Sequence, residues 1–133
     1  MPLLFILFLI LLSSDMHAQK RAMEHSDFEH WNSIRSVKIT NNGQWMAYHL
    51  KPLKGDQELH LKHTQKDKSG LYPRAEGPLF SYDGRCLAFR QVLSKDSVDV
   101  LRRKKVKTKD MPHDTLVIVD IKTLSTVRIE DLR

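Results

Sequence analysis

Two segments of this sequence, residues 39–48 and 80–89, match each other at an offset of 41 residues. After an apolar residue, both read hydroxyl, any residue, Asn or Asp, Gly, polar, bulky, apolar, Ala, aromatic. The Asn-Gly and Asp-Gly pairs at 42–43 and 83–84 accept the positive φ of tight turns, and the apolar runs behind them are too short for a helix. Each segment therefore predicts a tight turn that enters a buried strand. The alanine common to both predicts a place where a neighbouring sheet comes close.

A second pair of similar segments follows the first pair in the same order. Residues 58–63 alternate apolar and polar side chains before a polar stretch at 66–70. Residues 115–121 are a stronger strand pattern, followed by a polar turn at 122–125 and a further strand at 126–130. Both segments predict a hairpin, that is, a strand, a polar turn and a strand.

The repeating unit is therefore a turn and strand, a connector, and a hairpin, and it occurs twice between about Val37 and Arg133. Repeats of about 40–50 residues that contain only short strands are typical of propeller blades. A single sandwich or barrel with similar-looking strands is the alternative. We predict an all-β chain that forms the first blades of a β-propeller with WD40-like or Tol-type repeats. Blade 1 is expected at residues 37–78 and blade 2 at 79–133.

The second unit is longer than the first, because its hairpin follows the first hairpin by 57 residues rather than 41 (Leu59 to Leu116). The insertion is expected at about 93–113, and it contains the basic run Arg102–Lys109. Such a run could bind nucleic acid or another anionic polymer. No aromatic residue is interleaved for base stacking, so a solvated hairpin or loop, with no nucleic-acid partner, is the prediction.

The first eighteen residues differ in character from the rest. Residues 3–12 are ten consecutive apolar residues, too few to span a bilayer core of about 30 Å but typical of a secretory signal peptide that ends at a small residue, here Ala18. We therefore expect a signal peptide at 1–18, no membrane span after its cleavage, and a periplasmic or extracellular protein. Since the formal charge is +6 and Asp15 is the only charged side chain in that segment, the remainder would carry +7.

A lead-in segment at 19–36 separates this leader from the repeats. Ser26 and Glu29 have the spacing of a capping box at a helix start. Phe28, Trp31 and Ile34 recur every three residues, which predicts a short amphipathic helix at 27–35 packed on the first blade.

No catalytic, cofactor-binding or metal-binding residue is expected in this chain. The sequence has seven histidines, but His60 and His63 on a strand point to opposite faces, and His25 and His30 lie on different sides of a helix. These histidines are expected at the surface. Cys86 occupies the position of Trp45 in the first unit and is expected to be a buried, inert thiol.

Three stretches of the chain resemble a known family, namely residues 25–50, the FSYDGRCLAF sequence at 80–89, and KKVKTKDMPHDTLVIVDIKT at 104–123. They are similar to the N-terminal region of secreted prolyl oligopeptidase-family serine peptidases from Bacteroidetes-type bacteria. The resemblance implies a β-propeller that precedes a C-terminal α/β-hydrolase domain. It also places the bulky and small apolar residues of the two segments on inner strands: Trp45, Ala47, Tyr48, Leu87, Ala88 and Phe89.

The family's catalytic motif is missing from this sequence, because none of its five glycines brackets a serine in a Gly-x-Ser-x-Gly elbow. The resemblance thus implies a substrate-gating propeller truncated before its hydrolase domain, with a peptide substrate or the missing domain as partner and no peptidase activity of its own. A non-enzymatic periplasmic propeller that binds proteins is the alternative. In either case two blades leave strand edges open, so the isolated chain is expected to be poorly folded or to self-associate through these edges.

Overall fold

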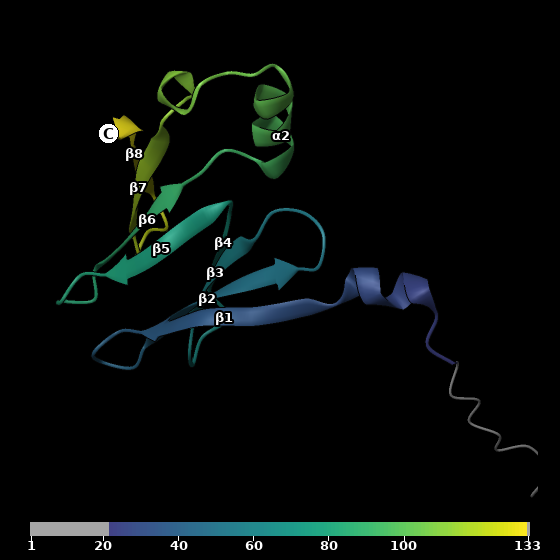
Figure 1. Cartoon of the computed structure of the whole chain (residues 1–133). Helices are drawn as coiled ribbons and strands as arrows, with labels where there is room; N and C mark the ends of the chain where they lie inside the picture. Colours follow the sequence, from purple (N-terminus) through teal and green to yellow (C-terminus); the bar gives the residue numbers. More distant parts are fainter. Residues whose placement is uncertain (1–21, 133) are drawn as a thin grey trace, which may run out of the picture.

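The computed structural model describes residues 22–132 and consists mainly of two four-stranded antiparallel sheets (Figure 1). The expected leader at 1–18 lies outside the described residues. The first sheet contains, in spatial order, β1 (Asn32–Ile39), β2 (Trp45–Pro52), β3 (Glu58–His63) and β4 (Ser69–Pro73). The second sheet contains, in the same order, β5 (Ala75–Phe80), β6 (Cys86–Gln91), β7 (Asp114–Asp120) and β8 (Thr126–Leu132).

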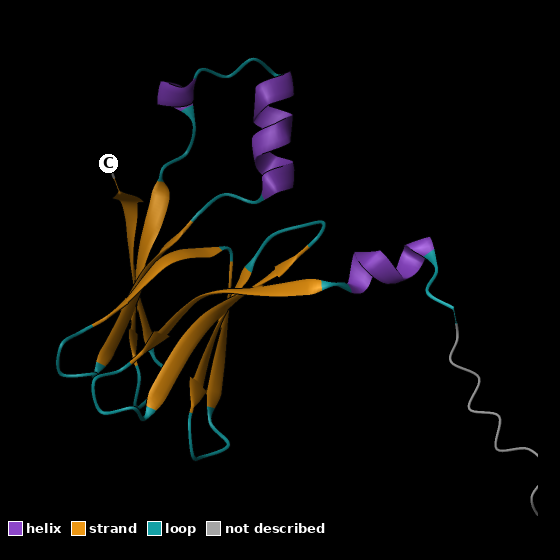
Figure 2. Ribbon diagram, turned by 60° about the horizontal axis from the view of Figure 1, so that its bottom comes forward, coloured by secondary structure: helices purple, strands orange, loops and turns teal. Residues whose placement is uncertain are grey.

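Each sheet is a meander in which consecutive strands are neighbours, and the second sheet repeats the first (Figure 2). The strands expected from the two repeated turns and the two hairpins are confirmed as β2, β3, β6, β7 and β8, and the polar stretch at 66–70 leads into β4. The prediction of an all-β repeat is therefore confirmed.

Each unit has four strands, however, and not the three expected from its sequence. Both missed strands come first in their sheets, β1 and β5, and they start before the boundaries expected at residues 37 and 79. Every residue of β1 is exposed, so no buried alternation marks it. Strand β5 contains Gly77-Pro78, a pair that argues against a strand except at an edge.

The two first strands also share a bulge at the same repeat position. The pairing of β1 with β2 shifts between Arg35 and Lys38, where Ser36 has φ +52°. The pairing of β5 with β6 shifts between Glu76 and Leu79, where Gly77 has φ +60°. The repeat thus extends to backbone details of strands that the side-chain pattern does not reveal.

The lead-in forms a 3-10 helix, η1 (His25–His30), and not the helix expected over 27–35. The capping box is made by Glu24 and Asp27, with the Glu24 amide donating to the Asp27 carboxylate (2.8 Å). A spacing of three fits the three residues per turn of a 3-10 helix, and the rings of Phe28 and Trp31 meet edge to face at 4.8 Å. Ile34 belongs to β1, because pairing with β2 satisfies the backbone from Asn32 onward.

A hydroxyl and an Asn or Asp side chain organise each repeated turn. In the first turn the Thr40 hydroxyl donates to Asn42 Oδ1 (2.7 Å) and accepts from the Trp45 amide (3.1 Å). The amide of Gln44 donates to the same Asn42 oxygen (3.0 Å), and Gly43 closes the turn at φ +67°.

The second turn repeats this network with Ser81 and Asp83. The Ser81 hydroxyl donates to Asp83 Oδ1 (2.6 Å) and accepts from the Cys86 amide (2.9 Å), and the Arg85 amide donates to Asp83 Oδ1 (3.1 Å). The two turns are also joined, because the Asn41 side-chain amide donates to the Tyr82 carbonyl (3.0 Å). The repeated hydroxyl is therefore structural in both units.

The second turn predicts a dependence of stability on pH. Hydrogen bonds from the Ser81 hydroxyl and the Arg85 amide lower the pKa of Asp83 below its ordinary 3.8. Because the folded-state pKa is depressed, the stabilisation is complete above about pH 3.8 and is lost as the pH falls through the lower folded value. Carbon NMR titration of the Asp83 carboxyl is expected to give a midpoint below 3.8.

Asp83→Asn is the matched control, because the first turn already uses Asn42 at this position. This variant retains the oxygen acceptor without the charge, so its melting temperature is expected to fall less than that of the wild type between about pH 5 and pH 2. Equal losses in the two proteins would contradict the role given to the Asp83 carboxylate.

The core lies between the two sheets and uses alternate residues of the central strands. On the first sheet, Trp45, Ala47, Leu59 and Leu61 are buried; on the second, the buried residues are Ala75, Leu87, Phe89, Val117, Val119 and Ile121. Ala47 is completely inaccessible, as expected for a close approach of the second sheet. The residues predicted on inner strands lie on two different faces. Four of them are buried in the interface between the sheets, namely Trp45, Ala47, Leu87 and Phe89. Tyr48 and Ala88 are only partly buried and lie on outward faces.

A single residue, Arg74, connects the two sheets. It lies between Pro73 at the end of β4 and Ala75 at the start of β5, with φ +58°. Its amide donates to the Gln57 carbonyl (2.9 Å), and its carbonyl accepts from the Val92 amide (3.0 Å). The connection is therefore bonded to both sheets.

The insertion in the second unit is helical and differs from the expected hairpin or loop. It contains α2 (Lys95–Arg103) and a 3-10 turn, η2 (Thr108–Asp110), both above one end of the second sheet (Figure 1). Ser94 caps the helix by accepting from the Ser97 amide (3.1 Å). Arg102 and Arg103 lie in the last turn, where positive charge interacts favourably with the helix dipole.

Candidate functional site

The first strands of the two sheets lie side by side and form a shared surface (Figure 1). A hollow of about 350 Å³ lies where these strands run into the repeated turns, lined by residues 38–41 and 78–82. Tyr82 at its edge is 92% exposed and Leu79 is 67% exposed. Apart from Lys38 and Tyr82, its lining has no ionisable side chain, so it offers contact area and backbone groups rather than a reacting group.

The histidines of the first hairpin lie on opposite faces, as predicted, but His63 is not at the surface. It is 7% exposed and packs edge to face on Trp45 with ring centroids 5.0 Å apart. Its Nδ1 accepts from the amides of Gln65 and Lys66 (3.1 Å each), so the ring proton sits on Nε2. His63 is therefore a buried structural residue that organises the turn after β3.

Two further histidines make contacts within or between the sheets. His49 is 4% exposed, and its Nε2 lies 2.9 Å from the Ala75 carbonyl, which links the two sheets. His60 stacks on Tyr48 with centroids 5.3 Å apart and lies 3.5 Å from Glu58. The side chains of His25 and His30, considered above for a metal site, lie outside the described part of the chain. Within that part, no group of three His, Cys, Asp or Glu side chains could hold a metal ion.

A second hollow of about 440 Å³ opens between the turns at the same end of both sheets. Its lining includes four basic side chains and one carboxylate, namely Lys66, Lys68, Arg85, Lys122 and Asp83. Arg85 is paired with Asp83 (3.6 Å), and the Lys68 ammonium donates to the Lys122 carbonyl. These basic groups are largely solvated and partly neutralised, and they do not form an enclosed site.

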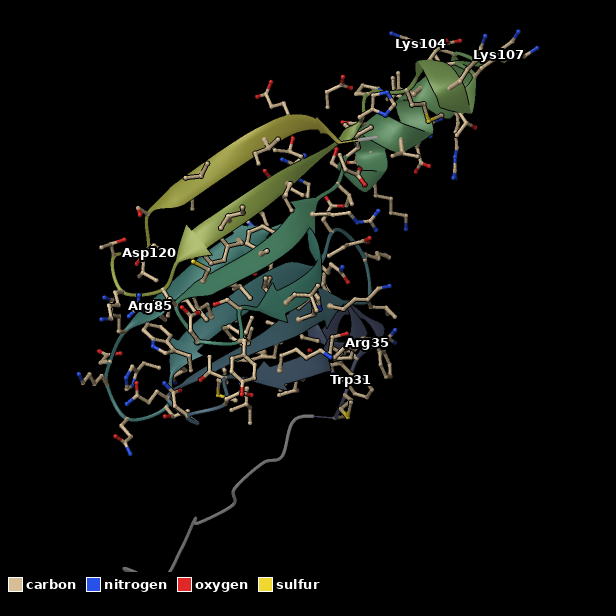
Figure 3. The ribbon with its side chains drawn as sticks, turned by 90° about the vertical axis from the view of Figure 1, so that its left-hand side faces the viewer. Trp31, Arg35, Arg85, Lys104, Lys107 and Asp120 are labelled. Atoms are coloured by element: carbon tan, nitrogen blue, oxygen red, sulfur yellow. The ribbon has the colours of Figure 1, made fainter. Side chains whose placement is uncertain are left out.

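The basic run projects away from the sheets. Figure 3 shows Lys104 and Lys107 at the tip of the helical insertion with their side chains directed outward. Helix α2 and the η2 turn contain no buried residue. The run is thus a solvated surface, as predicted, although it is carried by a helix and the turn after it.

Cys86 is only half-buried, in contrast to the buried thiol expected. It lies on the outward face of the second sheet and pairs with Asp120 across the ladder. Its repeat equivalent, Trp45, lies in the interface between the sheets. The same repeat position is therefore covered in the first unit and partly open in the second.

The described residues include no helix long and apolar enough to cross a membrane. The site residues that sequence reasoning missed are structural, namely Thr40, Ser81, His49 and His63. The hydroxyls were visible as part of the repeated pattern, but the burial of His49 and His63 depends on the second sheet.

Comparison with known proteins places the fold among propellers. No family model matches the sequence, and no curated protein matches it. Among solved structures, the chain is similar to the β-propeller domain of the trilobed protease from Pyrococcus furiosus (20% identity, TM-score 0.52), over 74% of this chain and 28% of that chain.

Two acylaminoacyl peptidases are also similar in structure. One is in complex with Z-Gly-Gly-Phe-chloromethyl ketone (16% identity, TM-score 0.58, 83% of this chain and 16% of that chain). The other is the Pyrococcus horikoshii enzyme (15% identity, TM-score 0.59, 85% of this chain and 16% of that chain). The chain thus spans between about a sixth and little more than a quarter of these structures. At these identities the likeness concerns the fold, and it shows that the two sheets are blades of a β-propeller.

Proposed function

We propose that this chain is the N-terminal propeller part of an exported serine peptidase of the prolyl oligopeptidase type, in which it restricts access of peptides to a separate hydrolase domain. The observation that carries this proposal is the fold shared with the propeller domain of a protease and with two acylaminoacyl peptidases. The resemblance of residues 25–50, 80–89 and 104–123 to the same family supports it independently.

The surface suited to this role is the pair of first strands. Propeller blades surround a central channel, and β1 and β5 are first strands that meet side by side. The hollow between them has the exposed Tyr82 and Leu79 at its edge. These side chains would contact a peptide that passes along the channel, while the chemical step takes place on residues that this chain does not contain.

The test uses the protein that the source organism makes. An antibody against the α2 insertion is used to isolate the native product from the periplasmic or secreted fraction, and the product is treated with a fluorophosphonate probe. We expect a labelled protein much longer than 133 residues, and we expect Z-Gly-Gly-Phe-chloromethyl ketone to prevent the labelling. An exported product that contains only further propeller units and takes no label would overturn the peptidase proposal, and a product found only in the cytoplasm would overturn export.

A further inference from the structure

The hollow of about 440 Å³ between the turns is formed by equivalent parts of the two units. Each unit contributes its repeated turn, with Gln44 in the first and Arg85 in the second. Each also contributes the turn of its hairpin, with Lys68 in the first and Lys122 in the second. Because both sheets belong to the described residues, this hollow does not depend on how many blades the whole protein has.

Hydrogen bonds hold the walls of the hollow in place. In each unit a backbone hydrogen bond of 2.9 Å joins the turn of the hairpin to the repeated turn, from Thr64 to Gln44 and from Ile121 to Arg85. The Lys68 ammonium donates to the Lys122 carbonyl and so joins the turns of the two hairpins. The groups that line the hollow are therefore positioned in advance, which reduces the ordering cost of binding a ligand.

The charge of the hollow is unbalanced. Four basic side chains and one carboxylate line it, which leaves three positive charges in excess. Arg85 pairs with the carboxylate of Asp83 (3.6 Å), so the excess lies on Lys66, Lys68 and Lys122. Like charges held close together raise the free energy of this arrangement, and an anion bound between them relieves the repulsion.

A buried histidine adds a directed donor to these charges. His63 lines the hollow although it is only 7% exposed, and its Nδ1 accepts from two turn amides, so its proton lies on Nε2. In the described part of the chain nothing accepts a hydrogen bond from this Nε2–H, and the one fully buried side-chain nitrogen without a partner there belongs to His60 instead. Solvent therefore reaches Nε2 of His63 through the hollow, where only an acceptor can use its proton.

We propose that the hollow binds a small soluble anion with several negative charges on phosphate-type oxygens, which accept from the His63 Nε2–H and from the three lysines. Such oxygens are strong acceptors, whereas a single carboxylate cannot balance an excess of three charges. A water molecule occupies about 30 Å³ in the liquid, so the hollow has room for an anion the size of pyrophosphate. The inference does not depend on the proposed function, because none of the residues of this hollow lines the peptide-facing hollow between β1 and β5.

Isothermal titration calorimetry of the full-length gene product with inorganic pyrophosphate tests the proposal. We expect saturable binding of pyrophosphate, no binding of acetate, and binding weakened about three- to fivefold by Lys122→Gln, as for the loss of one exposed ion pair. Lys104→Gln is the matched control, because it removes the same charge on the insertion, far from Arg85 (Figure 3), and is expected to leave the affinity unchanged. Absence of pyrophosphate binding, or equal weakening by the two variants, would overturn the proposal.

Asp83→Asn is expected to give a gain that loss of stability cannot imitate. The substitution removes the carboxylate of the hollow and releases Arg85 from its ion pair, while Asn42 shows that an amide suits the same turn position. We expect pyrophosphate to bind about three- to fivefold more tightly to this variant. Unchanged or weaker binding would contradict an anion site in this hollow.

The histidine donor is tested separately with His63→Asn. The asparagine oxygen can replace Nδ1 as the acceptor for the two turn amides, but no donor remains at the position of Nε2–H. We expect about three- to fivefold weaker binding in a protein whose fold circular dichroism verifies, and equal affinity of the folded variant would overturn the role given to His63. The variants of Lys122 and Asp83, both at exposed positions, test the site whether or not His63→Asn folds.

Discussion

Replacing Leu87 with alanine is expected to destabilise the chain more than most other single truncations. Leu87 is completely buried at the centre of the interface between the sheets. Removal of such a side chain costs about 2–5 kcal/mol through lost transfer energy and the remaining cavity. Because domains are stable by only about 5–15 kcal/mol, this loss would separate the two sheets or leave them marginally paired.

The measurement is urea unfolding at low protein concentration, monitored by the fluorescence of Trp45, which is buried in the same interface. Leu79→Ala is the matched control, since Leu79 lies on the adjacent strand and is 67% exposed. Its effect is expected to stay within about 0.5 kcal/mol. Equal midpoints for the two variants would show that the sheets do not pack as described.

The second large effect is expected from overfilling the interface at Ala47. This residue is completely buried where the second sheet approaches the first. Additional methylene groups in a well-packed core cost about 1–3 kcal/mol. Ala47→Leu should therefore lower the free energy of unfolding by this amount, measured in the same urea titration.

The repeat provides its own control for this prediction. Ala88 is the equivalent residue in the second unit, but it is only partly buried and lies on the outward face. Ala88→Leu is expected to change the free energy of unfolding of the single chain by less than about 0.5 kcal/mol. Similar destabilisation by both leucines would contradict the assignment of faces.

The sequence alone predicts those strands whose own residues show the turn chemistry and the apolar pattern of a buried strand. The turns at 42–43 and 83–84 and the apolar residues after them predict β2 and β6 because turn chemistry and burial are local there. The hairpins are predicted for the same reason. The close approach of a neighbouring sheet, predicted from the common alanine, is confirmed at Ala47, whereas Ala88 is only partly buried on an outward face.

The first strands and the lead-in could not be predicted in this way. Strand β1 is exposed along its whole length and is defined by its pairing with β2, not by its own pattern. The bulges at Ser36 and Gly77 further disrupt alternation. The burial of His63 and Cys86 depends on which face of each sheet is covered by a neighbour. The order of the strands along the chain does not specify that face.

The single-residue connection at Arg74 has a consequence for synthesis. The first sheet is complete in sequence at Pro73, and β5 follows after one residue. A single repeat cannot bury its apolar face alone, and the core of this chain is shared between the two sheets. The first sheet is therefore expected to pack only after β5–β8 have left the ribosome. Because Arg74 is the only residue between β4 and β5, the second sheet then begins directly beside the first one.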